Sequence, residues 1–133
     1  MLRTALLALA LVIPAFGSST AQDRVPDARE HFNARQGDLV LLSEYLGALH
    51  RLSQVCGNYG EGDLYRERMK QVIEGESPPR FTREAMIGAF NRGFRRTSAR
   101  HLACGRAAEQ AFRQEASSAM QVNDRLYAPL RGQ

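Results

Sequence analysis

Cys56 and Cys104 are the only cysteines of this 133-residue chain, and they lie far apart in the sequence. In an oxidising compartment, an isolated even pair is typical of one structural disulfide. Redox-active pairs usually have the close spacing of a C-x-x-C motif, which is missing here. Closing so long a loop would stabilise the fold by about 4 kcal/mol on the chain-entropy model. We therefore predict a Cys56–Cys104 disulfide, with two buried free thiols as the alternative.

A zinc site is the rival interpretation of the same residues. His50 and His101 precede the two cysteines by six and three positions, and two cysteines with two histidines would suit zinc. However, His50 lies among the apolar residues Leu49 and Leu52, where a histidine is more often part of a helix surface. Oxidation of the thiols would also destroy the site. We expect no metal and no cofactor, and the absence of a C-x-x-C-H motif excludes covalently attached haem.

No catalytic motif is present. The chain lacks a G-x-S-x-G elbow, an H-E-x-x-H sequence and a glycine-rich phosphate loop. Carboxylates such as Glu44, Glu74 and Glu84 are spread over predicted helix surfaces, and nothing marks out a pair of them. The sequence therefore does not predict an enzyme.

Arginines are concentrated in one segment. Between residues 80 and 106 there are seven arginines and a single acidic residue, Glu84, so this segment carries a charge of +6. Guanidinium groups on one helix flank can bind phosphate or carboxylate groups through paired hydrogen bonds. The candidate anion or partner patch consists of Asn91, Arg92, Arg95, Arg96 and Arg100. The alternative is that these arginines pair with acidic residues of the same fold, such as Glu61, Asp63 and Glu67.

The first 21 residues have the pattern of an export signal. Arg3 supplies the positive start, an apolar run extends from Ala5 to Phe16, and Ser19 and Ala21 offer small side chains before a cleavage point. The run is about 12 residues, short of the roughly 20 that span a bilayer, and no later segment is apolar enough to cross a membrane. We predict a cleaved signal, a periplasmic location and a mature net charge of +3.

The remaining chain predicts one all-α domain. Apolar residues recur at steps of three and four after Asp38, after Asp63 and from near Thr82, and no segment alternates as a strand does. We expect a small bundle of three to four helices with one disulfide. Its predicted parts are a flexible lead-in over 22–37, a helical domain over 38–128 with a first helix at 39–56, and a tail over 129–133.

Two details of the predicted helices concern their ends and their contacts. Thr97-Ser98 is either a break or a weak point within a longer helix, and Pro129 closes the last helix. Gly47 lies in the middle of the first helix, and small residues recur at every fourth position at Ala85, Ala89 and Gly93. Because glycine costs about 1 kcal/mol in a helix interior, we predict that close helix approach compensates for it.

Several blocks together carry a family resemblance. They are Leu46–Leu52 leading to Cys56-Gly57, then Tyr65–Met69, then Ala89–Arg95, and finally Cys104. The chain resembles an uncharacterised family of small exported proteins from alphaproteobacteria, a domain of unknown function, over about residues 38–127. The resemblance implies a disulfide between the two cysteines and no activity, cofactor or substrate. Tyr65 stands where the family pattern has tryptophan, and Phe94 where it has tyrosine.

We expect a non-catalytic periplasmic protein that contacts a partner protein or an anionic envelope component. The arginine segment supports this expectation, while the location disfavours nucleic acid as the partner. The alternative is a structural or chaperone-like envelope protein.

Overall fold

The computed structural model describes residues 24–128, which form four helices. They are α1 (Arg24–Cys56), α2 (Leu64–Glu76), α3 (Arg80–Arg100) and α4 (Arg106–Tyr127). No strand occurs within this range. The prediction of an all-α bundle of three to four helices is therefore confirmed.

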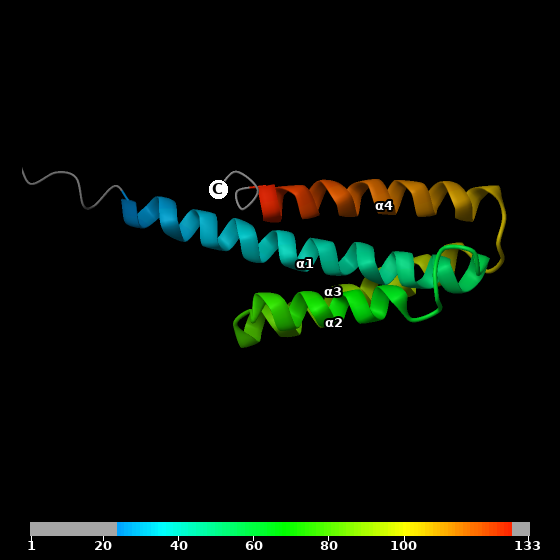
Figure 1. The fold of residues 1–133 in the computed structure, drawn as a ribbon, viewed down its shortest axis with the longest axis horizontal. Coiled ribbons are helices and arrows are strands. Elements are labelled where there is room, and N and C mark those ends of the chain that lie inside the picture. Colours follow the sequence, from blue (N-terminus) through cyan, green and yellow to red (C-terminus); the bar gives the residue numbers. More distant parts are fainter. Residues whose placement is uncertain (1–23, 129–133) are drawn as a thin grey trace, which may run out of the picture.

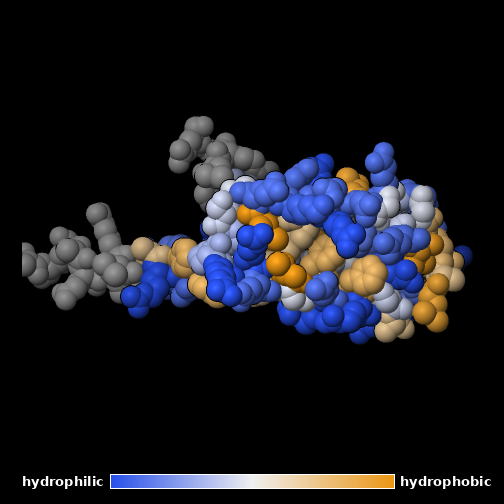
Figure 2. All heavy atoms as spheres, turned by 90° about the horizontal axis from the view of Figure 1, so that it is seen from below, coloured by the Kyte–Doolittle hydropathy of each residue, from blue (hydrophilic) through white to orange (hydrophobic). Residues whose placement is uncertain are grey.

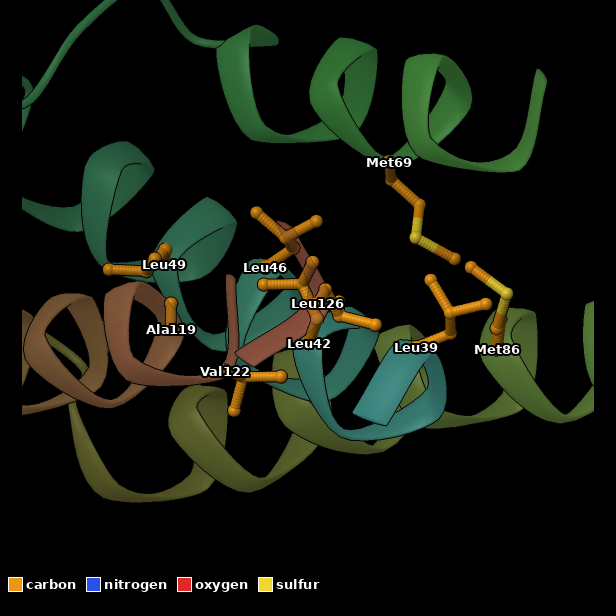
Figure 3. Packing of buried hydrophobic residues seen from close by; sticks show 9 residues of the cluster. All are labelled: Leu39, Leu42, Leu46, Leu49, Met69, Met86, Ala119, Val122 and Leu126. Atoms are coloured by element: carbon orange, nitrogen blue, oxygen red, sulfur yellow. The ribbon is translucent and has the colours of Figure 1, made fainter. Parts of the chain in front are cut away.

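Helix α1 is the central element of the molecule. Figure 1 shows α4 on one side of it and α2 and α3 on the other, with consecutive helices running in opposite directions. All three partners pack against α1, and α3 does so most extensively. The core contains four leucines of α1 together with residues of α2, α3 and α4 (Figure 3): Leu39, Leu42, Leu46, Leu49, Met69, Met86, Ala119, Val122 and Leu126. Burial of this leucine stripe holds the other helices around α1.

Helix α1 begins at Arg24, so the predicted lead-in over 22–37 is wrong for residues 24–37, which are helical. Good helix formers such as Ala28, Glu30 and Ala34 occupy this stretch. Extending a packed helix needs no new nucleus, so these turns form without an apolar stripe. They project beyond the other helices (Figure 1), and Ala28 to Ala34 are exposed. The predicted signal (1–21) and tail (129–133) lie outside the described residues.

The predicted helix ends agree with the structure at most positions. Gly57 has a left-handed φ of 67° directly after α1, and Ser77 has a φ of 44° directly after α2. At Thr97-Ser98, however, α3 is unbroken. It continues to Arg100, and the interruption lies at 101–105. The Ser98 hydroxyl donates to the Phe94 carbonyl one turn earlier, so its side chain is satisfied within the helix.

Two glycines bring α1 and α3 into backbone contact. A Cβ atom at Gly47 would overlap the carbonyl oxygen of Phe90, and one at Gly93 would overlap the carbonyl oxygen of Glu44. Ala89 is fully buried between them. The predicted close approach is confirmed for Gly47 and Gly93. Ala85 is exposed, because the buried row of α3 is Thr82, Met86, Ala89, Gly93 and Thr97.

Candidate functional site

The two cysteines form the predicted disulfide. Their Cα atoms lie 4.8 Å apart, and the bond joins the last residue of α1 to the loop between α3 and α4. Cys104 is exposed and Cys56 is half-buried, so the bridge lies at the edge of the fold. Because both sulfurs are used, the rival zinc site has lost its thiolate ligands. Within residues 24–128, no three His, Cys, Asp or Glu side chains are grouped to hold a metal ion.

His50 belongs to the core. Its side chain is only 4% exposed and lies beside the rings of Phe90 and Phe94. The centroid of the imidazole is 5.7 Å from the centroid of each phenylalanine ring. Its Nε2 atom is 3.3 Å from the amide nitrogen of Gln54. Burial is the main cause that lowers its pKa, and the nearby positive charge of Arg66 lowers it further. The imidazole is therefore held in its neutral form as a packing residue of the α1–α3 contact.

The five residues of the predicted patch divide into two stripes on α3. Arg92, Arg96 and Arg100 are spaced by four and lie on the side of α3 that meets α1 and α4. Asn91 and Arg95 follow a neighbouring line and are exposed. Asn91 is therefore a surface residue on a different line from the stripe of three arginines.

Arg96 is committed to the fold. Its guanidinium donates to a Glu44 oxygen on α1 and, at 3.0 Å, to Oε1 of Glu115 on α4, and its side chain is 34% exposed. Arg92 lies 3.6 Å from the second Glu44 oxygen. All three ion pairs cross between helices, and Arg96 joins α3 to both α1 and α4.

The carboxylates named as alternative partners do not pair with the patch. Asp63 lies 3.9 Å from Arg66, and Glu67 lies 2.6 Å from Lys70, both within or next to α2. Glu44 and Glu115 are the carboxylates that pair with arginines of the patch. Nothing in the local sequence around them predicts this pairing.

Arg95 and Arg100 remain available. Both are exposed, and neither forms an ion pair or a hydrogen bond with another of the described residues. Guanidinium groups in this situation can bind an external carboxylate or phosphate without breaking an internal contact.

Arg100 lines a groove of about 260 Å³ between the C-terminal end of α3 and the N-terminal half of α4. Its lining combines charged, amide and small side chains: Leu52, Arg96, Thr97, Arg100, His101, Ala107, Gln110, Ala111, Gln114 and Glu115. Glu115 is the groove's one carboxylate. Arg96 binds its Oε1 atom, and its Oε2 atom is buried without a hydrogen-bond partner. The two arginines of the groove outnumber this carboxylate, so its net charge is positive, which suits an anion.

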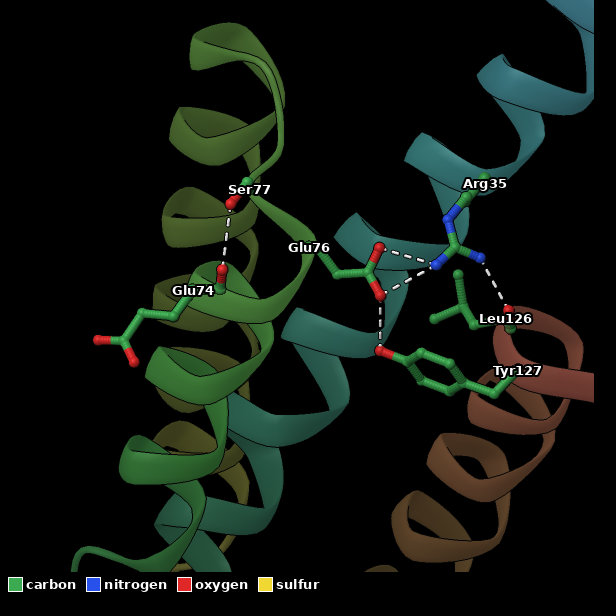
Figure 4. Close-up of polar contacts among 6 residues, drawn as sticks. All are labelled: Arg35, Glu74, Glu76, Ser77, Leu126 and Tyr127. Carbon is green, nitrogen blue, oxygen red and sulfur yellow. Dashed lines mark hydrogen bonds and ion pairs between the residues drawn. The ribbon is translucent and has the colours of Figure 1, made fainter. Parts of the chain in front are cut away.

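A second polar cluster closes the other end of the molecule (Figure 4). Arg35 binds both carboxylate oxygens of Glu76, at 2.8 and 2.9 Å, and donates to the carbonyl of Leu126 at 2.7 Å. The Tyr127 hydroxyl donates to Glu76 at 2.8 Å. Burial and this hydrogen bond raise the pKa of Tyr127 to about 12. The cluster ties α1, α2 and α4 together, and we assign it a structural role.

Comparison with protein-family models identifies one match. A model described as a protein of unknown function, DUF2385, covers residues 35–129. The chain belongs to this family. The match includes both cysteines, the α1–α3 glycine contact and the whole groove, so every feature described above except the first turns of α1 lies in the family domain. Searches of curated proteins and of solved structures found no match.

None of the four helices within residues 24–128 is long and apolar enough to cross a membrane.

Proposed function

We propose that this protein is a non-catalytic binding protein of the bacterial envelope, exported to the periplasm, that contacts an anionic envelope component or partner. The contact surface is the C-terminal half of α3. The observation that carries the proposal is the pair of exposed, uncompensated arginines, Arg95 and Arg100, in a segment that holds one acidic residue.

The stability of the scaffold supports this role. Arg96 pairs with carboxylates of α1 and α4, so the part of α3 that presents Arg95 and Arg100 is fixed near the C-terminal end of the helix. The disulfide fixes the loop directly after Arg100. A surface whose backbone is already ordered loses little conformational entropy when it binds.

The export part of the proposal rests on the signal pattern of residues 1–21, and the disulfide is consistent with an oxidising compartment. Cell fractionation followed by intact mass measurement tests it. A periplasmic chain that begins near Gln22 supports export, and a full-length chain recovered from the cytosol refutes it.

Salt elution from an anionic resin tests the binding surface. The bridged chain without residues 1–21 is compared with the double variants R95S/R100S and R29S/R83S. All four arginines are exposed, so both variants lose the same charge from the surface. We expect the parent and R29S/R83S to elute together and R95S/R100S to elute at lower salt. Equal elution of the two variants would show that only net charge matters and would reject the surface.

A chaperone-like role is the second candidate, and a separate observation favours it. Phe81 and Ile87 of α3 are 65% and 46% exposed. Figure 2 shows the face away from α4, where apolar side chains interrupt a largely polar surface. On this hypothesis the protein suppresses aggregation of a denatured client, and F81S/I87S weakens suppression while R95S/R100S does not.

A further inference from the structure

The loop between α3 and α4 carries the most exposed large apolar side chain of residues 24–128. Leu102 is 83% exposed, and the next in order, Met120, is 67% exposed. The rest of the stretch 99–107 consists of small residues, one histidine and two arginines. Leu102 is therefore the one large apolar group of this surface, which lies at the end of the bundle where α1 also ends (Figure 1).

The disulfide holds this loop in place. Cys104 follows Leu102 by two positions and is bonded to Cys56, the last residue of α1. Helices α3 and α4 fix the two ends of the loop, which is only five residues long, at 101–105. Leu102 therefore has little freedom to turn inward, and a partner that covers it orders few additional groups.

Two free arginines flank Leu102. Arg100 ends α3 and Arg106 begins α4, and both are exposed. Neither guanidinium forms an ion pair or a hydrogen bond with another residue of the described range. No acidic residue occurs from position 85 to position 108. Protein–protein contacts combine an apolar centre with a polar rim, and arginine is enriched in them. This surface has that composition, and its charge is complementary to carboxylates.

Three other occupants fit this surface less well. A hydrophilic anion, such as a polyphosphate or an acidic saccharide, leaves Leu102 in water. A bilayer gains little from Leu102, because even a whole myristoyl chain binds membranes only marginally and a leucine side chain is much shorter. In a two-fold contact between copies of this chain, centred on Leu102, the arginines of one copy would face those of the other.

We infer that the α3–α4 loop docks a partner protein whose surface has an apolar pocket for Leu102 and carboxylates for Arg100 and Arg106. This inference rests on the proposed function, because it extends the arginine surface into the loop and names the class of partner.

Photo-crosslinking identifies the occupant. Benzoylphenylalanine is introduced at position 102 of the full chain, or at position 120 as the matched control, in the cells that naturally produce the protein. Met120 is also a highly exposed apolar residue, and it lies in the C-terminal half of α4. We expect a protein to be captured from position 102 and not from position 120. R100S/R106S should reduce this capture severalfold.

Titration of the captured protein, once purified, against the bridged chain measures the contribution of the leucine. Burial of a leucine side chain strengthens an interaction by about tenfold or more, so L102A should weaken binding at least about tenfold. M120A should leave the affinity unchanged. Both side chains are exposed, so neither substitution removes a core contact. Added salt should weaken binding of the parent, because Arg100 and Arg106 contribute through their charge.

The outcomes separate the inference from the proposed function. The inference is overturned if position 102 captures nothing, lipid or a second copy of this chain, or if L102A binds the captured protein as tightly as the parent does. In those cases polyglutamate decides whether the arginine surface stands: it stands if the parent binds polyglutamate more tightly than R95S/R100S does. If the parent binds neither a captured protein nor polyglutamate, both the inference and the proposed function are wrong.

Discussion

Replacing Gly47 or Gly93 by alanine tests how α1 and α3 meet. In each case the new Cβ overlaps a backbone carbonyl oxygen of the other helix, so no side-chain rotation can relieve it and the helices must separate. Overpacking of this kind costs about 3 kcal/mol at the upper end of its usual range. Alanine regains about 1 kcal/mol of helix propensity relative to glycine. We expect each substitution to lower the free energy of unfolding by about 2 kcal/mol.

Gly88 is the matched control on the same helix. A Cβ there meets only the Arg92 Nη1 atom, at an ordinary 3.6 Å, so G88A should gain up to about 1 kcal/mol. Urea unfolding of the disulfide-bridged chain, followed by circular dichroism, measures all the variants. Because one separation of the helices relieves both overlaps, G47A/G93A should cost less than the sum of the single losses. If G47A is as stabilising as G88A, the backbone contact between α1 and α3 does not exist.

Three further predictions concern the bridge, the buried His50 and the half-buried Tyr127. The double variant C56S/C104S should lose about 4 kcal/mol of unfolding free energy, and the intact non-reduced parent should weigh two hydrogens less than its reduced form. His50 has a pKa below the 6.5 of an unfolded histidine, so the unfolded state binds more protons and stability falls as the pH drops below about 6.5. The urea midpoint of H50Q should fall less than that of the parent over this range. Y127F should lose about 1 kcal/mol, because its hydroxyl donates to Glu76. An absorbance titration should show one tyrosine of the parent ionising near pH 12, and the stability due to its raised pKa should disappear as the pH rises from 10 to 12.

Each of these predictions has a clear contrary result. Rapid alkylation of both thiols in the native protein would contradict the bridge. Identical pH dependence of the parent and H50Q would show that the buried imidazole does not control acid stability. An unchanged alkaline titration in Y127F would assign the high pKa to another tyrosine.

The helices could be predicted where burial imposes a period. The leucines from Leu42 to Leu52 recur at helical steps because one face of this part of α1 is covered by the other helices. Gly57 and Pro78-Pro79 end their helices by backbone geometry alone. Residues 27–34 of α1 carry no such period because they are exposed. The pattern of apolar residues therefore could not predict that α1 begins at Arg24.

Contacts between helices were predictable only in special cases. The disulfide followed from there being two cysteines and no other choice of partner. The Arg96 pairs with Glu44 and Glu115, and the Arg35–Glu76 pair, join residues whose meeting depends on how each helix is rotated about its axis. Local spacing does not fix that rotation. For the same reason the sequence indicated an arginine patch but not which of its members the fold would neutralise.

The most direct test of the binding surface is a titration of a labelled acidic polypeptide, polyglutamate, with the parent, R100S and R83S, at low and at physiological ionic strength. Binding through exposed guanidinium groups predicts that the parent and R83S bind equally, that R100S binds at least severalfold more weakly, and that added salt weakens the parent. Equal affinity of all three proteins, or affinity that salt does not change, would contradict anion binding at the end of α3.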